Sequence, residues 1–93
     1  MINNQRTTIV NVRFEKCDIY CGRPSYFSNP FLIQRDGTRD EVIEKYREWF
    51  HKRVLTDSVF RGRILLLKGK RLGCWCAPKR CHLEVIVEYL KNL

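Results

Sequence analysis

Alternating apolar and polar positions predict three short strands in this chain. Residues 7–15 alternate with period two and carry β-branched side chains, so apolar side chains fall on one face. Residues 17–21 form a second short run of this kind. Residues 71–76 form a third, in which Leu72 and Cys74 share a face.

A capping box predicts where the first helix begins. The hydroxyl of Thr38 can accept a hydrogen bond from the backbone N–H of Glu41, and the Glu41 carboxylate can accept one from the N–H of Thr38. Apolar residues then recur at helical spacing with charged residues between them. The helix is therefore expected to run to about residue 54.

Two further helices follow by the same reasoning. Thr56 or Asp57 can cap a helix that continues through Leu67, and residues 82–90 place apolar side chains at helical spacing. Because strands and helices are intermixed, the predicted class is α/β, with a three-stranded mixed sheet packed with about three helices.

Composition narrows the classes of partner. The chain is short enough to form a single small domain, residues 1–93, of which residues 1–6 are expected to be flexible. Its 18 Lys and Arg residues outnumber its 10 Asp and Glu residues, for a formal net charge of +8. That excess favours an anionic partner, such as a nucleotide, a nucleic acid or the acidic face of a host protein.

Hydrophobicity argues against a membrane partner. The longest apolar run covers residues 64–67, far short of the roughly 20 residues that cross a bilayer. Residues 1–6 carry no apolar core of the kind found in a secretory signal. We therefore expect a protein of the cytoplasm or nucleus.

The 5 cysteines allow three interpretations of their role. An odd number without a secretory signal argues against a disulfide framework. Cys74, Cys76 and Cys81 fall in one segment, and His82 follows directly. These four residues can form a zinc site of the Cys3His type, Cys76 or Cys81 can be a reactive thiol, or all of them can be packed core residues. No cofactor is required, and zinc is the alternative.

Basic side chains next to this cluster favour an anion. Lys79 and Arg80 precede Cys81 and His82, which fall at a helix N-terminus, where free N–H groups and the helix dipole attract negative charge. The same conditions lower the pKa of a thiol, and His82 can act as a general acid or base. If there is chemistry, the catalytic candidates are Cys76, Cys81 and His82.

Cys74 and Arg80 also have the Cys-x5-Arg spacing of the loop that cradles phosphate in phosphatases. That loop needs its cysteine at the end of a strand, whereas the predicted strand continues to residue 76. We therefore expect the match to be accidental.

The segment 22–31 is the second candidate site. It mixes Gly, Pro, Ser and Asn with aromatic residues, a composition typical of an ordered functional loop rather than a helix or strand. Its aromatic rings can stack on a base, and its apolar residues can equally plug the core beneath the loop. The ligand-binding residues expected from both segments are Gly22, Arg23, Ser25, Tyr26, Asn29, Trp75, Lys79 and Arg80.

Two motifs give the chain a family resemblance. They are Gly-Arg-Pro-Ser at 22–25 with Asn-Pro-Phe at 29–31, and Cys-Trp-Cys at 74–76 with Cys-His at 81–82. With these motifs the chain resembles, from about residue 8 to 90, an uncharacterised family, a numbered domain of unknown function found in bacteria and often in phage genomes. The resemblance implies that the two motif segments form one shared site, and it implies no particular reaction.

The chain departs from the family pattern at a few positions. Phe27 and Ser28 stand where a Trp-Gly pair is usual, and Leu83 stands where a small residue, commonly Gly, is usual. The residues outside the pattern include Cys17, Cys21 and Arg80. This weakens a metal site that uses Cys17 or Cys21 and a phosphatase-like role of Arg80.

These observations predict a small basic domain that binds a phosphate-containing ligand, namely a nucleotide, a nucleotide derivative or a nucleic-acid end. The pocket is expected where the 22–31 and 74–82 loops meet, at the ends of the strands. Thiol or histidine chemistry there stays open, so the sequence does not decide whether the chain is an enzyme. The alternatives are a structural zinc domain and a phage-type interaction domain that inhibits an acidic host protein without catalysis.

Overall fold

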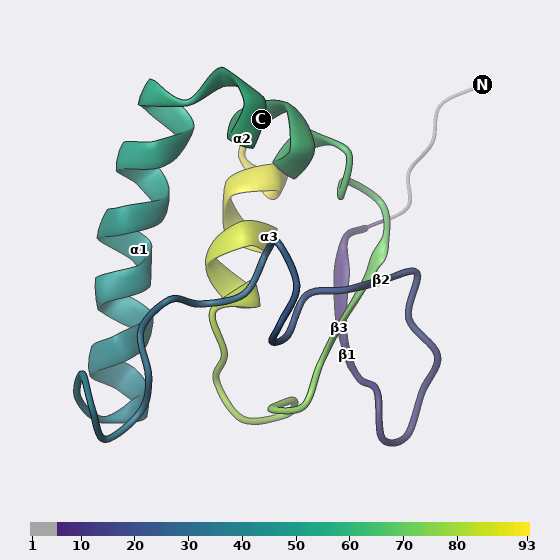
Figure 1. The fold of residues 1–93 in the computed structure, drawn as a ribbon. Helices are drawn as coiled ribbons and strands as arrows, with labels where there is room; N and C mark the ends of the chain where they lie inside the picture. The colour runs from purple at the N-terminus through teal and green to yellow at the C-terminus, as the bar shows by residue number, and fades with distance from the viewer. Residues whose placement is uncertain (1–5) are drawn as a thin grey trace.

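A computed structural model describes residues 6–93, and Figure 1 shows how its elements are arranged. In chain order they are β1 (Thr8–Asn11), β2 (Ile19–Tyr20), α1 (Arg39–Thr56), α2 (Ser58–Leu65), β3 (Arg71–Cys74) and α3 (Leu83–Lys91). Helix α3 stands between α1 and the strands, and α2 lies on the path from α1 to β3. The segment predicted to be flexible, residues 1–6, lies outside the described residues except for Arg6.

The strands form a parallel sheet in the order β1-β3-β2. The α/β class, with three strands and three helices in the described part of the chain, is confirmed, but the prediction of a mixed sheet is wrong. The reason is that β3 enters between the two earlier strands after a crossover through α1 and α2, and such a crossover returns the chain in the same direction. The carboxyl ends of all three strands therefore face one edge of the sheet.

The first strand is shorter than its pattern predicts, because the Asn11 side chain ends it. Its Oδ1 accepts a hydrogen bond from the N–H of Arg13 at 2.9 Å, and the N–H of Phe14 donates to the Asn11 carbonyl oxygen at 3.0 Å. These bonds close a turn, so the alternation through residue 15 is not a strand, and Phe14 is 76% exposed.

The same asparagine sets the end of the central strand. Nδ2 of Asn11 donates to the carbonyl oxygens of Trp75 and Ala77, at 3.2 and 2.8 Å. These bonds hold the chain in a turn directly after Cys74. The strand predictions that prove too long are 7–15, 17–21 and 71–76.

The helices begin at the predicted caps. The N–H of Glu41 donates to the Thr38 hydroxyl at 3.2 Å, and the N–H of Thr38 donates to the Glu41 carboxylate at 2.8 Å. For α2, Asp57 and not Thr56 is the cap, since its carboxylate accepts from the N–H of Phe60 at 3.0 Å. Helix α1 continues past its predicted end, whereas α2 stops before its own.

The core forms where α3 packs between α1 and the sheet. Its buried side chains come from every helix and from the central strand. The largest include Tyr46 and Phe50 of α1, Phe60 of α2, Leu72 of β3, and Leu83 and Ile86 of α3. This core holds the C-terminal edge of the sheet close to the first turn of α1.

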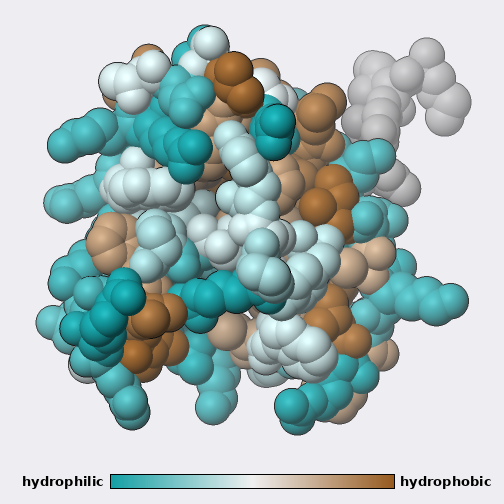
Figure 2. All heavy atoms as spheres, in the orientation of Figure 1, coloured by the Kyte–Doolittle hydropathy of each residue, from teal (hydrophilic) through white to brown (hydrophobic). Residues whose placement is uncertain are grey.

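The outer side of α1 is mostly hydrophilic in Figure 2, and apolar groups on that face of the molecule form separate patches. Among residues 6–93, no helix combines the length and the apolar character needed to span a bilayer.

A substitution at Gly73 tests how closely the loop at 12–17 packs against the face of the sheet that Gly73 faces. A Cβ at Gly73 would lie 2.6 Å from Cys17 Sγ and 2.6 Å from Val12 Cγ1. We expect Gly73→Ala to lower the free energy of unfolding by about 1–3 kcal/mol, because overpacking forces neighbouring side chains and backbone to move. Urea-induced unfolding followed by circular dichroism measures the change.

Gly62→Ala is the matched control. Gly62 is exposed within α2, and a Cβ there meets nothing within 4 Å. We expect this variant to gain about 0.5–1 kcal/mol, because alanine has less backbone freedom to lose in a helix. A Gly73→Ala protein as stable as the unmodified chain would contradict the close cover of the sheet.

Candidate ligand-binding site

A cavity of about 390 Å³ lies at the edge of the sheet where the strands end. Both motif segments line it, together with the first turn of α1. Its walls are formed by Gly22, Arg23, Asn29, Phe31, Leu32, Ile33, Arg39, Val42, Ile43, Cys74, Trp75, Cys76, Arg80, Cys81 and His82. The structure thus places side by side two segments that are far apart in the sequence.

His82 joins these two segments. Its Nε2 lies 3.2 Å from the carbonyl oxygen of Cys21 and 2.9 Å from that of Phe27. The residue is 8% exposed, and its ring meets the Tyr46 ring edge-on with 5.1 Å between centroids. Burial lowers the pKa of His82 to about 4, so near pH 7 the imidazole is neutral and its Nε2–H donates to the carbonyls. This geometry gives His82 a bracing role, and its role as a general acid or base stays a prediction.

A chain of hydrogen bonds ties the same segments together at the rim. The indole N–H of Trp75 donates to the Tyr20 hydroxyl at 3.0 Å, and that hydroxyl donates to the Arg23 carbonyl oxygen at 2.7 Å. Tyr20 thereby folds over Gly22, where a Cβ would lie 2.5 Å from the phenol oxygen. A Cβ at Gly22 would therefore push the Tyr20 ring away from its two hydrogen bonds.

The loop at 22–31 is braced by its own side chains. Nη2 of Arg23 donates to the carbonyl oxygens of Asn29 and Phe31, at 3.2 and 3.0 Å. Oδ1 of Asn29 accepts from the N–H of Phe31 at 2.9 Å. Within residues 6–93, the other Arg23 nitrogens and the Asn29 amide nitrogen have no partner, so these donors are available at the cavity wall.

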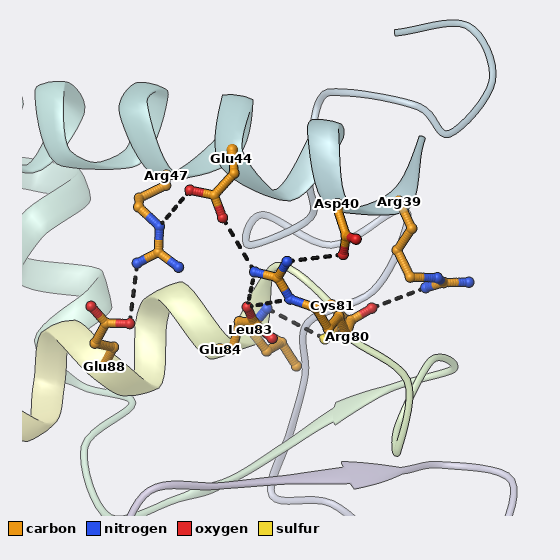
Figure 3. A network of polar contacts seen from close by, with 9 residues as sticks. All are labelled: Arg39, Asp40, Glu44, Arg47, Arg80, Cys81, Leu83, Glu84 and Glu88. Atoms are coloured by element: carbon orange, nitrogen blue, oxygen red, sulfur yellow. Dashed lines mark hydrogen bonds and ion pairs between the residues drawn. The ribbon is translucent and has the colours of Figure 1, made fainter. Parts of the chain in front are cut away.

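Arg80 lies at the cavity wall with its charge already paired. Its guanidinium donates to Asp40 at 2.9 Å, to Glu44 at 3.2 Å and to Glu84 at 2.9 Å (Figure 3). These hydrogen bonds raise the pKa of the guanidinium and join the loop to α1 and α3. Three carboxylates around one cation argue against the predicted role of Arg80 as a phosphate ligand.

Arg39 is a cavity residue that the sequence patterns do not single out. It begins α1, and its Nη1 donates to the Arg80 carbonyl oxygen at 3.0 Å (Figure 3). In the part of the chain that the structure describes, no carboxylate pairs with it. The capping box predicts the helix start, but only the fold brings that turn to the motif loops.

Cys74 and Cys81 form a buried sulfur pair. The Cys81 thiol donates to Cys74 Sγ at 3.6 Å, and the N–H of Leu83 donates to Cys81 Sγ at 3.4 Å. The hydrogen bond from the Cys81 thiol, and after it the N–H groups of Ala77 and Cys76, lower the pKa of Cys74. The same sulfur contact and burial raise the pKa of Cys81. A thiolate is therefore favoured at Cys74 rather than at Cys81, which is one of the two predicted nucleophiles, Cys76 and Cys81.

The structure does not assemble the zinc site or the phosphatase-like loop that the sequence suggested. Within residues 6–93, no group of three or more His, Cys, Asp or Glu side chains is placed to hold a metal ion. The predicted Cys3His ligands (Cys74, Cys76, Cys81 and His82) therefore do not converge on a metal position. The strand does end at Cys74, as a phosphatase loop needs, but Arg80 is bound to carboxylates instead of forming a phosphate cradle.

Three predicted ligand residues lie outside the cavity wall. The Tyr26 ring lies 4.4 Å from the guanidinium carbon of Arg63 on α2. Ser25 Oγ is buried without a hydrogen-bond partner among the described residues, and Lys79 is an exposed turn residue whose N–H donates to the Cys76 carbonyl oxygen at 2.8 Å. Loop residues have no periodicity that tells which side chain points inward, so the sequence could not separate these three from their neighbours.

Comparison with protein families gives the cavity a context. Residues 2–92 match the family described as a domain of unknown function, DUF4326. The chain belongs to the DUF4326 family. This confirms the resemblance to a domain family without a described function.

Viral proteins are similar to this DUF4326 chain. An uncharacterised 12.4 kDa protein from the nrdA-td intergenic region of Enterobacteria phage T4 is 28% identical over 85 residues, which cover 91% of this chain and 78% of that protein. An uncharacterised protein of Acanthamoeba polyphaga mimivirus is 35% identical over 72 residues, which cover 67% of this chain and 52% of that protein. No solved structure matches the chain.

Burial of a neutral histidine makes the stability of the DUF4326 chain depend on pH. The pKa of His82 is about 4 in the folded state, below the ordinary 6.5, so protons bind more strongly to the unfolded chain. The contribution of this group is therefore full above pH 6.5 and is lost as the pH falls toward 4. We expect this histidine to contribute a loss of about 2 kcal/mol between pH 7 and pH 5, measured by urea unfolding as the difference between the unmodified chain and a His82 variant.

His82→Gln should reduce this dependence by the contribution of His82, whatever the stability of the variant at pH 7. His51→Gln, on an exposed position of α1, is the control and should keep the pH profile of the unmodified chain. An unchanged slope in His82→Gln would show that the imidazole is not held neutral in the folded state.

Proposed function

We propose that this DUF4326 chain binds a small phosphate-bearing ligand, most simply a nucleotide, in the cavity between the two motif loops. The composition of the wall carries this proposal: among the described residues it contains Arg23, Arg39, Phe31 and Trp75 but no carboxylate. The cavity volume of about 390 Å³ is in the range of small-molecule pockets. A ligand with an anionic end and a flat apolar end fits this wall.

Arginine chemistry favours phosphate at one end. Arg80 contributes little, because its charge is surrounded by carboxylates. Arg23 keeps Nε and Nη1 free within the described residues, and Arg39 uses one nitrogen for a carbonyl contact. A planar guanidinium can pair with two phosphate oxygens at once. Hydrogen bonds already hold both side chains, so less side-chain entropy is lost on binding.

Aromatic and apolar side chains favour a base at the other end. Trp75 is 57% exposed, and its bond to the Tyr20 hydroxyl fixes the direction of the indole. A ring held this way offers a stacking surface, which is worth about 1–3 kcal/mol per base. Val42 and Ile43 add apolar wall, and the Asn29 amide nitrogen can donate to the edge of a base.

Titration calorimetry tests the proposal with nucleoside mono-, di- and triphosphates, the matching nucleosides and inorganic phosphate. We expect nucleotides to bind and nucleosides to bind at least about tenfold more weakly, because a hydrogen bond to a charged group is worth about 1.5–3 kcal/mol. For the same reason, Arg39→Gln should weaken nucleotide binding by about tenfold or more.

Lys79→Gln is the matched control, since it removes the same charge from the neighbouring loop but outside the cavity wall. It should bind nucleotides as the unmodified chain does. Equal weakening by Arg39→Gln and Lys79→Gln would mean that net charge, and not the cavity, holds the anion. If neither a nucleotide nor an oligonucleotide end binds, the proposal fails, and the protein-interaction alternative becomes the favoured function.

A further inference from the structure

Two cysteine sulfur atoms lie close together at the cavity wall. Cys74 Sγ at the end of β3 and Cys81 Sγ just before α3 are 3.6 Å apart, and both residues line the cavity. They are 2% and 6% exposed, so the cavity is their route to solvent. We propose that Cys74 and Cys81 are a redox-active dithiol, which a small-molecule disulfide oxidises to an intramolecular disulfide. This inference does not depend on nucleotide binding.

Local contacts make Cys74 the attacking sulfur. It accepts a hydrogen bond from the Cys81 thiol, and the nearby N–H groups of Ala77 and Cys76 also lower its pKa. Donors that converge on a sulfur stabilise its thiolate, which is the nucleophilic form. Cys81 accepts from the N–H of Leu83 instead, and Figure 3 shows how this contact holds it at the start of α3.

The surroundings of the pair permit a bond. Sulfur atoms in a disulfide are about 2.05 Å apart, so the two must approach by about 1.5 Å. The residues between them form a turn and not a helix or strand, and Lys79 and Arg80 are exposed. The approach therefore needs no regular element to unfold.

The reaction balances as two thiol–disulfide exchanges. The Cys74 thiolate attacks one sulfur of the small disulfide, so that a mixed disulfide forms and one small thiolate leaves. The Cys81 thiol then passes its proton to that thiolate and attacks Cys74 Sγ, and the second small thiolate leaves and takes up the proton that Cys74 had released to solvent. Two protein thiols are oxidised, and one small disulfide is reduced to two thiols.

Cys76 provides an internal comparison. It lines the same cavity and is more exposed than either partner, and within residues 6–93 its sulfur makes no hydrogen bond. If exposure alone decided reactivity, Cys76 would react first. If the converging donors decide it, Cys74 reacts first.

The test treats the full chain with hydroxyethyl disulfide at pH 6, where an ordinary thiol is almost wholly protonated. Mass spectrometry of proteolytic fragments should find a Cys74–Cys81 disulfide in the unmodified chain and in Cys76→Ser. Cys81→Ser keeps a hydroxyl donor beside Cys74, so the reaction should stop at a mixed disulfide on Cys74. That adduct should form about tenfold faster than the adduct on Cys76.

A first adduct on Cys76, a Cys74–Cys76 disulfide or an unreacted pair would overturn the proposal. Cys74→Ser should leave Cys81 unmodified, because burial raises the pKa of the Cys81 thiol and its partner sulfur is gone. The decisive arm uses the unmodified chain, so a variant that fails to fold does not remove the test. Circular dichroism shows which variants keep the fold.

Discussion

One neutral imidazole holds the candidate site together. The carbonyl groups of Cys21 and Phe27 lie at a loop without a sheet ladder of its own, and a buried carbonyl left without a donor costs about 1–3 kcal/mol. His82 supplies the donor for both and stands at the first turn of α3, so one ring fixes the loop and the helix relative to each other. The bonds among Trp75, Tyr20 and Arg23 add a second connection at the rim.

The positive charge of the cavity wall depends on which arginines are paired with carboxylates and which are not. Glu44 binds both Arg80 and Arg47, and Arg47 also reaches Glu88 at 3.1 Å, so these two carboxylates are used between α1 and α3 (Figure 3). The wall of the cavity is left with arginine and no carboxylate among the described residues. A net charge of +8 would be the same wherever these pairs formed, so position and not total charge gives the cavity its sign.

Local signals in the sequence predicted local structure. The Thr38 capping box set the start of α1, and the glycine, proline and cysteine motifs marked the two loops that meet at the cavity. The rest depends on contacts between distant segments. The Asn11 side chain ends β3 from the neighbouring strand β1. Helix α1 brings Arg39 to the cavity wall, and its carboxylates pair with Arg80. The turn after Cys74 sets which thiol is favoured as thiolate. No periodicity or spacing encodes those contacts.

The central place of β3 also sets an order of events as the chain folds. Among the described residues, β1 and β2 pair only with β3, which follows them after two complete helices. Closing so long a loop is slow compared with forming α1 or α2. The first two strands must therefore stay unpaired until the last quarter of the chain is available. A nascent chain halted on the ribosome before Arg71 would have neither the sheet nor the cavity.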